Sequence, residues 1–214
     1  MLVGNRMTPN PITVSPDLSV TEAMQKMRQN NVHRFPVVDR QGKLVGIITY
    51  RDLLHASPSS ATSLSMWEIS YLLSQIKVKE VMTRNVITVG EDTTLEEAAG
   101  LMVDNEIGSL PVIHNDKIVG IITESDLFRV FREIFGAREK GIRLTLLAPY
   151  VKGSMAQITS AITHAGGLIL AFDTFEAEDP SKWGCTLKVS EISREQLLEA
   201  IKPHVLQVVD VREM

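Results

Sequence analysis

Two stretches of the chain place a threonine and an aspartate three residues apart, directly at the end of an apolar run. Residues 46–52 read GIITYRD and residues 120–126 read GIITESD. This pattern predicts a strand followed at once by a helix, whose first backbone N–H groups lack partners. There the carboxylate could accept hydrogen bonds from both hydroxyls of a ribose, while the threonine and the helix N-terminus could face a phosphate. The candidate nucleotide-binding residues are Thr49, Asp52, Thr123 and Asp126.

The same spacing also has a purely structural interpretation. Thr-x-x-Asp is close to a helix capping box, in which each side chain accepts a hydrogen bond from the other residue's backbone N–H. The two pairs could therefore do no more than begin their helices. One copy of the motif leaves both interpretations open.

The motif is duplicated together with the sequence around it. Residues 7–14 (MTPNPITV) recur as 82–89 (MTRNVITV), and residues 43–49 (KLVGIIT) recur as 117–123 (KIVGIIT). Repeats of this length indicate that one structural unit occurs twice. Each copy reads as strand, helix, strand, strand, helix, and the first helix of each begins at a capping box, Ser19 with Glu22 and Thr94 with Glu97. The predicted strands are 12–14, 35–38 and 44–49, with counterparts at 87–89, 110–113 and 117–123.

The order Met-Thr, Ile-Thr-Val, Pro-Val-Val and Gly-Ile-Ile-Thr-x-x-Asp, present twice over roughly residues 7–133, resembles the cystathionine-beta-synthase (CBS) domain pair. The resemblance implies two pseudo-symmetric β-α-β-β-α domains that form one module and bind nucleotides in two clefts between them. It implies ribose and phosphate contacts for the four residues named above. It also implies that main-chain and apolar groups enclose the purine, and these belong to Thr13, Phe35, Pro36, Ile87, Thr88, Ser109, Leu110 and Pro111.

The two copies differ in charge. The first has His33 and Arg34 before its Pro-Val-Val strand, and Arg51 within the signature, where the second has Gly108-Ser109 and Ser125. The His-Arg pair resembles the phosphate-binding pair in the gamma subunits of AMP-activated protein kinase. We expect the first-copy cations to hold most of the phosphate charge, so that one cleft binds more tightly. The alternative is a solvated surface pair.

The C-terminal part has a different pattern. Strands are predicted at 142–148, 168–172, 184–189 and 205–211, with helices that begin at the capping boxes Ser154–Gln157 and Ser193–Gln196. The order βαββαβ is the ferredoxin-like plan, and it resembles the ACT regulatory domain. Many ACT domains bind amino acids at an Asp-x-Pro-Gly-like turn, whereas residues 149–153 here read PYVKG. Dimerisation is therefore the expected role, with amino-acid binding as the alternative.

A Ser/Pro-rich linker at 57–63 separates the two copies. A helix that begins at the capping box Ser65–Glu68 follows it and carries Trp67, Tyr71 and Leu72. We expect this helix to pack on the module or on a partner subunit, with a direct ligand role for Trp67 or Tyr71 as the alternative. The predicted organisation is an α+β chain with a first CBS domain (1–56), a linker with a short helix (57–76), a second CBS domain (77–138) and an ACT-like domain (139–214).

Composition narrows the class of protein. A net charge of −4 with no basic run argues against binding to nucleic acid, and the single cysteine, Cys185, excludes an intramolecular disulfide. The five histidines show no metal-binding spacing, and no Walker A, G-x-S-x-G or G-x-G-x-x-G motif occurs. The apolar runs are too short to cross a membrane and the first residues do not resemble a signal peptide, so a cytoplasmic location is expected.

These patterns favour a non-enzymatic, homodimeric sensor that binds AMP, ADP, ATP or a related adenosyl ligand and acts on a protein partner. The CBS pair followed by an ACT-like domain is similar to the acetoin-utilisation regulatory proteins of bacteria. The alternatives are an assembly module or accessory subunit in acetoin or related metabolism, with no physiological nucleotide, an enzyme, and a transcription factor, for which no helix-turn-helix is found.

Overall fold

The computed structural model describes residues 1–56 and 65–214, so the predicted linker at 57–63 lies outside the described residues. The chain divides into two compact units, Met1–Leu127 and Phe128–Met214. No helix in the described part of the chain is long and apolar enough to cross a membrane.

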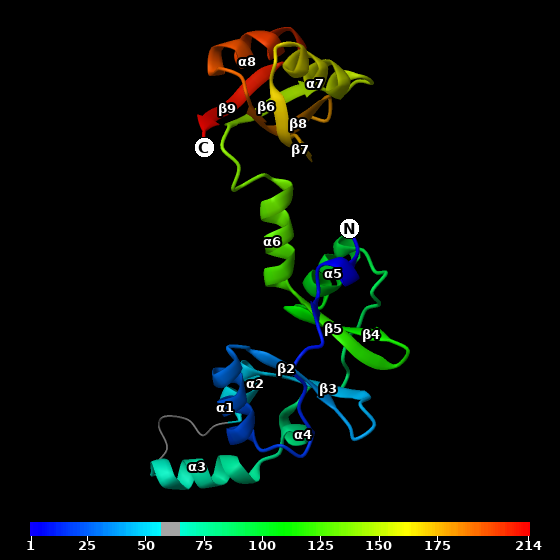
Figure 1. Cartoon of the computed structure of the whole chain (residues 1–214), viewed down its shortest axis with the longest axis vertical. Coiled ribbons are helices and arrows are strands. Elements are labelled where there is room, and N and C mark those ends of the chain that lie inside the picture. Colours follow the sequence, from blue (N-terminus) through cyan, green and yellow to red (C-terminus); the bar gives the residue numbers. More distant parts are fainter. Residues whose placement is uncertain (57–64) are drawn as a thin grey trace. The chain divides into compact units, whose positions relative to one another are not determined.

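The first unit contains both copies of the repeat (Figure 1). Its elements through the first copy are η1 (Val3–Asn5), β1 (Thr8–Pro9), α1 (Val20–Asn30), β2 (Arg34–Val38), β3 (Leu44–Thr49), α2 (Tyr50–His55) and α3 (Met66–Gln75). The second copy adds α4 (Val78–Val81), α5 (Leu95–Asp104), β4 (Ser109–His114), β5 (Lys117–Thr123) and α6 (Glu124–Ile134), which continues into the second unit. The capping boxes predicted at Ser19 and Thr94 are both present.

The strands predicted at 12–14 and 87–89 are wrong in extent. Each segment makes only a single parallel bridge, from Val14 to Val37 in the first copy and from Val89 to Val112 in the second. The reason lies in burial: Val14 is 4% exposed whereas Ile12 is 44% exposed, so the chain touches the sheet at one residue and then leaves it. The bridge still brings each segment beside its proline, because Val14 N donates to Pro36 O at 3.1 Å and Val89 N donates to Pro111 O at 3.1 Å.

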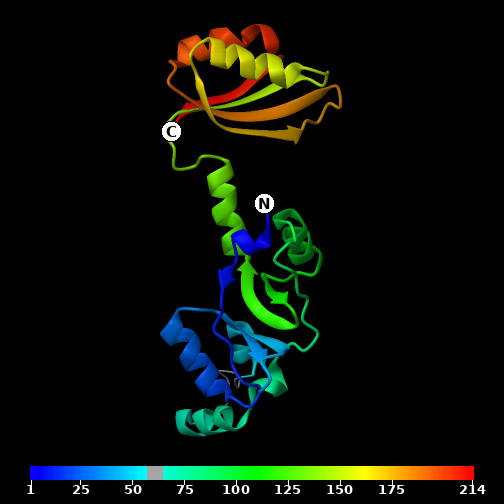
Figure 2. The same cartoon turned by 45° about the vertical axis from the view of Figure 1, so that its right-hand side comes forward.

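The Met-Thr segments are exchanged between the copies. Strand β1, which precedes the first copy, pairs antiparallel with β5 of the second copy, with Thr8 opposite Ile121. Thr83, which precedes the second copy, pairs with Ile47 in β3 of the first. In Figure 2 the blue N-terminal segment accordingly runs beside the green β5. The two copies are therefore tied together by reciprocal backbone pairing.

The exchanged segments also contribute side chains to the packing of the other copy. The core of the first copy includes Met27, Phe35, Ile48 and Leu53, and it also includes Val78 from the segment that leads into the second copy. Met82 packs over Gly46, and Met7 packs over Gly120, in the space that a Cβ at either glycine would occupy. A glycine in each signature strand thus leaves room for the methionine of the exchanged Met-Thr segment that covers it.

The second unit has the predicted element order β-α-β-β-α-β. Its elements are β6 (Ile142–Pro149), α7 (Ser154–His164), β7 (Leu168–Glu176), β8 (Lys182–Ser190), α8 (Arg194–Ile201), η2 (Lys202–His204) and β9 (Gln207–Glu213). The sheet order is β7-β8-β6-β9, with every neighbouring pair antiparallel.

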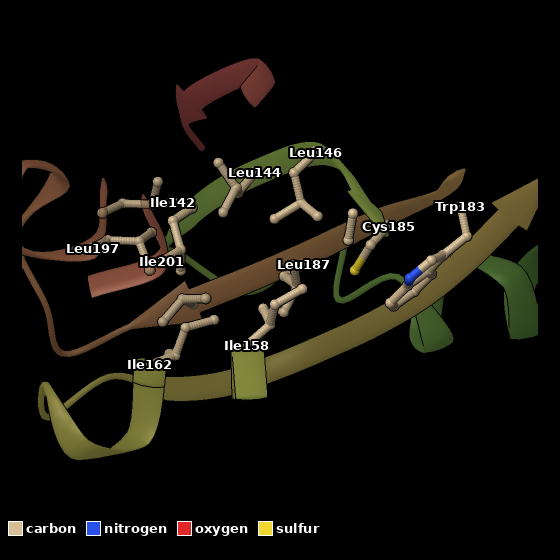
Figure 3. Close-up of a cluster of buried hydrophobic side chains, with 12 residues drawn as sticks. Ile142, Leu144, Leu146, Ile158, Ile162, Trp183, Cys185, Leu187, Leu197 and Ile201 are labelled. Carbon is tan, nitrogen blue, oxygen red and sulfur yellow. The ribbon is translucent and has the colours of Figure 1, made fainter. Parts of the chain in front are cut away.

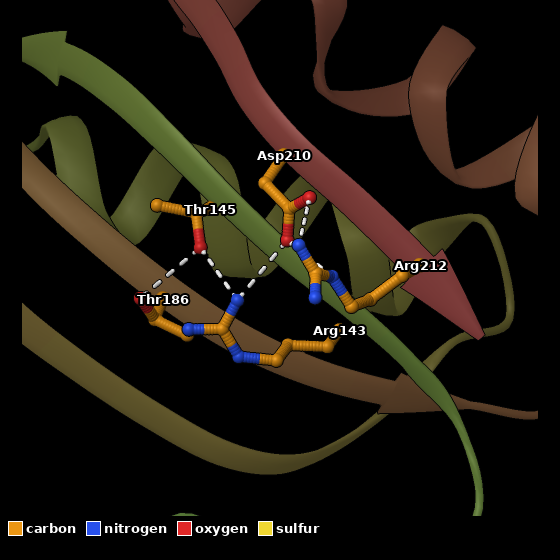
Figure 4. A network of polar contacts seen from close by, with 5 residues as sticks. All are labelled: Arg143, Thr145, Thr186, Asp210 and Arg212. Carbon is orange, nitrogen blue, oxygen red and sulfur yellow. Dashed lines mark hydrogen bonds and ion pairs between the residues drawn. The ribbon is translucent and has the colours of Figure 1, made fainter. Parts of the chain in front are cut away.

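One face of this sheet packs against the helices, and the other carries a polar network at its centre. Ile158 and Ile162 of α7 and Leu197 and Ile201 of α8 pack against alternate strand residues that include Leu144, as Figure 3 shows. The intervening β6 residues bear the network of Figure 4, in which Arg143 Nη1 lies 3.2 Å from Asp210 Oδ2 and 3.1 Å from Thr145 Oγ1. This alternation is the period of two expected for a sheet with a single packed face.

The capping box predicted at Ser154 is wrong. The residue that precedes α7 is Gly153, with a left-handed φ of 90°, and it makes no side-chain cap. The hydroxyl of Ser154 instead donates to Pro149 O at 2.8 Å, so the buried serine closes the loop between β6 and α7. The glycine permits this sharp entry because residues with a Cβ rarely adopt such a φ. At α8 the box at Ser193 is present as predicted.

Candidate functional site

The first signature corner is a complete capping box. Oδ2 of Asp52 accepts hydrogen bonds from Thr49 N at 2.8 Å and from Thr49 Oγ1 at 2.7 Å, while Asp52 N donates to Thr49 Oγ1 at 3.2 Å. Both bonds to the carboxylate use the same oxygen, so within the described part of the chain Oδ1 of Asp52 has no hydrogen-bond donor. The structural role and a ligand role can therefore coexist at this aspartate.

The second corner repeats the first. Oδ2 of Asp126 accepts from Thr123 N at 3.0 Å and from Thr123 Oγ1 at 2.6 Å, and Asp126 N donates to Thr123 Oγ1 at 3.3 Å. Asp126 is 5% exposed and thus buried more deeply than the half-buried Asp52. The capping interpretation of both motifs is confirmed, and the strand-to-helix corner on which the binding interpretation depends is present twice.

The residues before each Pro-Val strand lie directly beside the corners. Arg34 is the cross-strand partner of Thr49, and Ser109 is the partner of Thr123. In addition, Tyr50 N donates to His33 O at 2.7 Å, and Glu124 N donates to Gly108 O at 3.3 Å. Antiparallel pairing thus brings two separate sequence motifs together in each copy.

Arg34 extends from its own copy to the other. A Cβ built on Gly108 would lie 3.3 Å from Arg34 Nη1 and 2.9 Å from Glu124 Oε2, so the cation and the acid converge on the same point of the second copy. Burial lowers the pKa of the Arg34 guanidinium, and the negative charge of Glu124 acts in the opposite direction. Arg34 is half-buried, whereas His33 and Arg51 are exposed.

Sequence reasoning missed Gly108 and Glu124 as members of this site. A signal for both was present, since Gly108 stands where the first copy has His33 and Glu124 where it has Tyr50. Without the exchange between copies, nothing in the sequence said that Arg34 would meet them.

The residues expected around the purine are divided between core and surface. Phe35 and Leu110 are fully buried, and Pro36 and Pro111 are buried beside them, so their side chains form core and only main-chain groups could meet a ligand. Of the remaining residues, Ser109 is buried, Thr13 and Ile87 are half-buried and Thr88 is exposed. The described residues contain no group of three His, Cys, Asp or Glu that could hold a metal ion.

Two such corners, related by pseudo-symmetry and joined by reciprocal strand pairing, define a duplicated α+β module. A model of the CBS domain matches residues 3–59 and 78–133, more than half of the chain. This protein belongs to the CBS-domain family.

Relatives share the module rather than the whole chain. An inosine-5'-monophosphate dehydrogenase of Methanocaldococcus jannaschii is 37% identical over 138 residues, which are 64% of this chain and 25% of the dehydrogenase. A CBS domain-containing protein of Dictyostelium discoideum is 34% identical over 128 residues, which are 59% of this chain and 88% of that protein. The chain thus spans about a quarter of the length of the dehydrogenase, where the matched part is one piece of a larger enzyme.

Solved structures agree in fold. The CBS domain pair of protein MJ0100, in complex with 5'-methylthioadenosine and S-adenosyl-L-methionine, is 32% identical with a TM-score of 0.52, covering 65% of this chain and 98% of that one. A putative acetoin utilization protein (AcuB) from Vibrio cholerae is 32% identical with a TM-score of 0.53, covering 64% and 95%. CBSX2 in complex with AMP is 32% identical with a TM-score of 0.51, covering 62% and 97%.

Proposed function

We propose that this chain is a non-catalytic regulatory protein that binds an adenine nucleotide, or a related adenosyl ligand, in the clefts of its CBS pair. The observation that carries the proposal is the geometry of the first corner, where the capping box occupies only one oxygen of Asp52. The similar CBS pairs solved with AMP, 5'-methylthioadenosine and S-adenosyl-L-methionine support an adenosyl ligand.

Each group at the corners has a role in this proposal. Asp52 and Asp126 accept hydrogen bonds from the ribose hydroxyls, and Thr49 and Thr123 hold the carboxylates in place. Hydrogen bonds to a charged group contribute about 1.5–3 kcal/mol each. A few of them, together with an enclosed purine, reach the ~8 kcal/mol of a micromolar ligand.

The remaining predicted residues complete the ligand contacts. The first-copy cations His33, Arg34 and Arg51 bind phosphate. Main-chain groups enclose the purine where the segment around Val14 meets Pro36 and where the segment around Val89 meets Pro111. These contacts come from Thr13, Phe35, Pro36, Ile87, Thr88, Ser109, Leu110 and Pro111.

In this proposal, ligand binding regulates by changing how copies of the chain associate with one another. Helix α6 exposes Phe128 at 67% and Phe131 at 57%, and helix α3 exposes Trp67 at 87%. Exposed aromatic side chains grouped on a helix are typical of surfaces that bind another protein. We infer that they meet a second copy of the chain, and that a ligand alters the assembly by stabilising one of its states.

We infer that the C-terminal unit is a ferredoxin-like, ACT-like domain that serves dimerisation or binds a second effector. The sheet order β7-β8-β6-β9 supports the ferredoxin-like assignment. A cavity of about 900 Å³ between the β6–α7 loop and the β7–β8 hairpin, lined in part by Tyr150, Lys152 and Trp183, supports a second effector.

The second candidate function is an assembly module or accessory subunit, in acetoin or related metabolism, whose clefts bind no physiological nucleotide. The same exposed aromatic side chains favour it, and so does the similarity to the acetoin utilization protein. Ligand binding separates the two candidates.

The test is calorimetric titration of the full chain with AMP, ADP, ATP and S-adenosyl-L-methionine, before and after the substitutions Asp52→Asn and Asp126→Asn. Asparagine keeps the size of aspartate and can still accept the capping hydrogen bond, so it removes mainly the charge. We expect each substitution to weaken binding at its own corner by about tenfold or more, because a charge-assisted contact to ribose is lost.

The matched control is Glu22→Gln, which makes the same charge change in the capping box of α1, away from the corners. It should leave binding unchanged while lowering stability by an amount comparable to the aspartate variants, which unfolding experiments measure. If none of the four compounds binds the unaltered chain, or if Glu22→Gln weakens binding as much as the aspartate variants do, the proposal is wrong.

A further inference from the structure

One acidic side chain lies beside the cation expected to hold phosphate. Glu124 is the residue after Thr123 in the second signature, and its Oε2 lies 2.9 Å from the Cβ position of Gly108, beside Arg34 Nη1 at 3.3 Å from the same point. The phosphate role of Arg34 does not require this acid. An acid is an unexpected neighbour, because it lowers the positive potential that attracts an anion.

This approach of an acid to a cation of the other copy occurs in one direction only. In the pseudo-symmetric position, the first copy has Tyr50 in place of Glu124, and the second copy has Ser109 in place of Arg34. The backbone at both positions is the same, since residues 50 and 124 each donate to the carbonyl of the residue before the neighbouring strand. The proximity of the two opposite charges is therefore a property of these side chains and not of the repeat.

Glu124 is placed so that it can move away when a ligand binds to Arg34. Arg34 is half-buried and held in the cross-strand pair with Thr49, whereas Glu124 is exposed at the first position of α6. An exposed glutamate can rotate into solvent at little cost, because the attraction between exposed opposite charges contributes only about 0–1 kcal/mol. Its charge nevertheless remains near any phosphate that Arg34 binds.

We propose that Glu124 is a specificity-determining residue, whose charge offsets that of Arg34 and so limits how strongly the protein prefers phosphorylated over uncharged adenosyl ligands. This inference rests on the function proposed above. With Glu124 present, the protein binds adenosyl compounds with only a moderate gain from the phosphate. Without it, Arg34 acts on the phosphate alone.

Calorimetric titrations with adenosine and with AMP test this inference in the full chain. The measured quantity is the ratio of the two affinities, which cancels effects on the shared adenosine part. We expect Glu124→Gln to raise the preference for AMP by roughly threefold to tenfold, since the negative charge that offsets the Arg34 guanidinium is removed. In the Arg34→Gln background the same substitution should change the ratio by a clearly smaller factor.

Glu96→Gln is the matched control, because Glu96 is also an exposed first-turn acid, on α5, and the net charge changes equally. It should leave the ratio unchanged. The inference is wrong if Glu124→Gln does not raise the ratio, or raises it equally with and without Arg34. It is also wrong if Glu96→Gln raises the ratio as much as Glu124→Gln does. In each of these cases the proposed nucleotide binding itself still stands. If neither adenosine nor AMP binds any of these proteins, the proposed function fails together with the inference.

Discussion

The two signature corners share their backbone but not their charges. Each has the same three hydrogen bonds between threonine and aspartate, with corresponding lengths that differ by no more than 0.2 Å. Around the first corner stand His33, Arg34 and Arg51, whereas the second has Glu124 and small residues. The duplication has thus kept the hydrogen-bonded corner and varied the charges around it. Substitutions in matched pairs, one in each copy, can separate the shared part from the varied part.

The largest effect is expected at the glycines under the exchanged methionines. Gly46→Ala would place a Cβ against the Met82 side chain and 3.0 Å from the backbone oxygen of Thr83, whereas at Gly120 the nearest atoms all belong to the Met7 side chain. A flexible methionine can move aside and a backbone oxygen cannot. We expect Gly46→Ala to lower the free energy of unfolding by about 1–3 kcal/mol and Gly120→Ala by less, as measured by urea denaturation.

Gly100→Ala is the control for these two variants, because a Cβ at this position of α5 meets nothing within 4 Å. It should stabilise the protein by up to about 1 kcal/mol through helix propensity. Equal losses at Gly46 and Gly120 would show that the two copies are packed alike, contrary to the geometry.

A smaller effect is expected when the threonine hydroxyls are removed. Thr49→Val and Thr123→Val keep the shape of the side chain and delete the hydroxyl that accepts from the aspartate N–H and donates to its Oδ2. Each should therefore lower the free energy of unfolding by about 1 kcal/mol. Because the two boxes match, we expect the two losses to agree within experimental error. Losses that differ severalfold would mean that one threonine has a further partner that its counterpart lacks.

The part of the fold that follows local rules could be predicted from the sequence. The boxes at Ser19, Ser65, Thr94 and Ser193 are present because each rests on a hydrogen-bonding pattern that spans four residues. At Ser154 the same pattern failed, since a left-handed Gly153 set the entry of the helix instead. A four-residue capping pattern takes no account of the backbone conformation of the residue that precedes it.

The exchange between copies could not be predicted in this way. The repeats identified the Met-Thr segments, but which strand each would pair with depends on tertiary packing across more than 30 residues of chain. For the same reason, the sequence placed Arg34 and the two corners in the candidate site and left Gly108 and Glu124 out. Pairing within a copy is local, whereas the contact between copies is not.

The smallest effect concerns the capping boxes that begin α1 and α5, and it appears as a pH dependence. Hydrogen bonds from Ser19 lower the pKa of Glu22 from its usual 4.5, and hydrogen bonds from Thr94 lower the pKa of Glu97 from the same value. A carboxyl group whose pKa is lower in the folded state stabilises the protein above the unfolded pKa, and this stabilisation is lost as the pH falls through the folded pKa. The melting temperature of the unaltered protein should therefore fall more steeply below about pH 4.5 than that of Glu22→Gln or Glu97→Gln, with thermal denaturation between pH 3 and 7 as the measurement.

We expect the difference to be larger for Glu22, because Ser19 is 4% exposed whereas Thr94 is only half-buried, so that the first box is less screened by water. If neither glutamine variant reduces the fall of the melting temperature at low pH, these boxes stabilise their helices through the hydroxyl alone. The two boxes could then no longer serve as the reference with which the charged corners are compared.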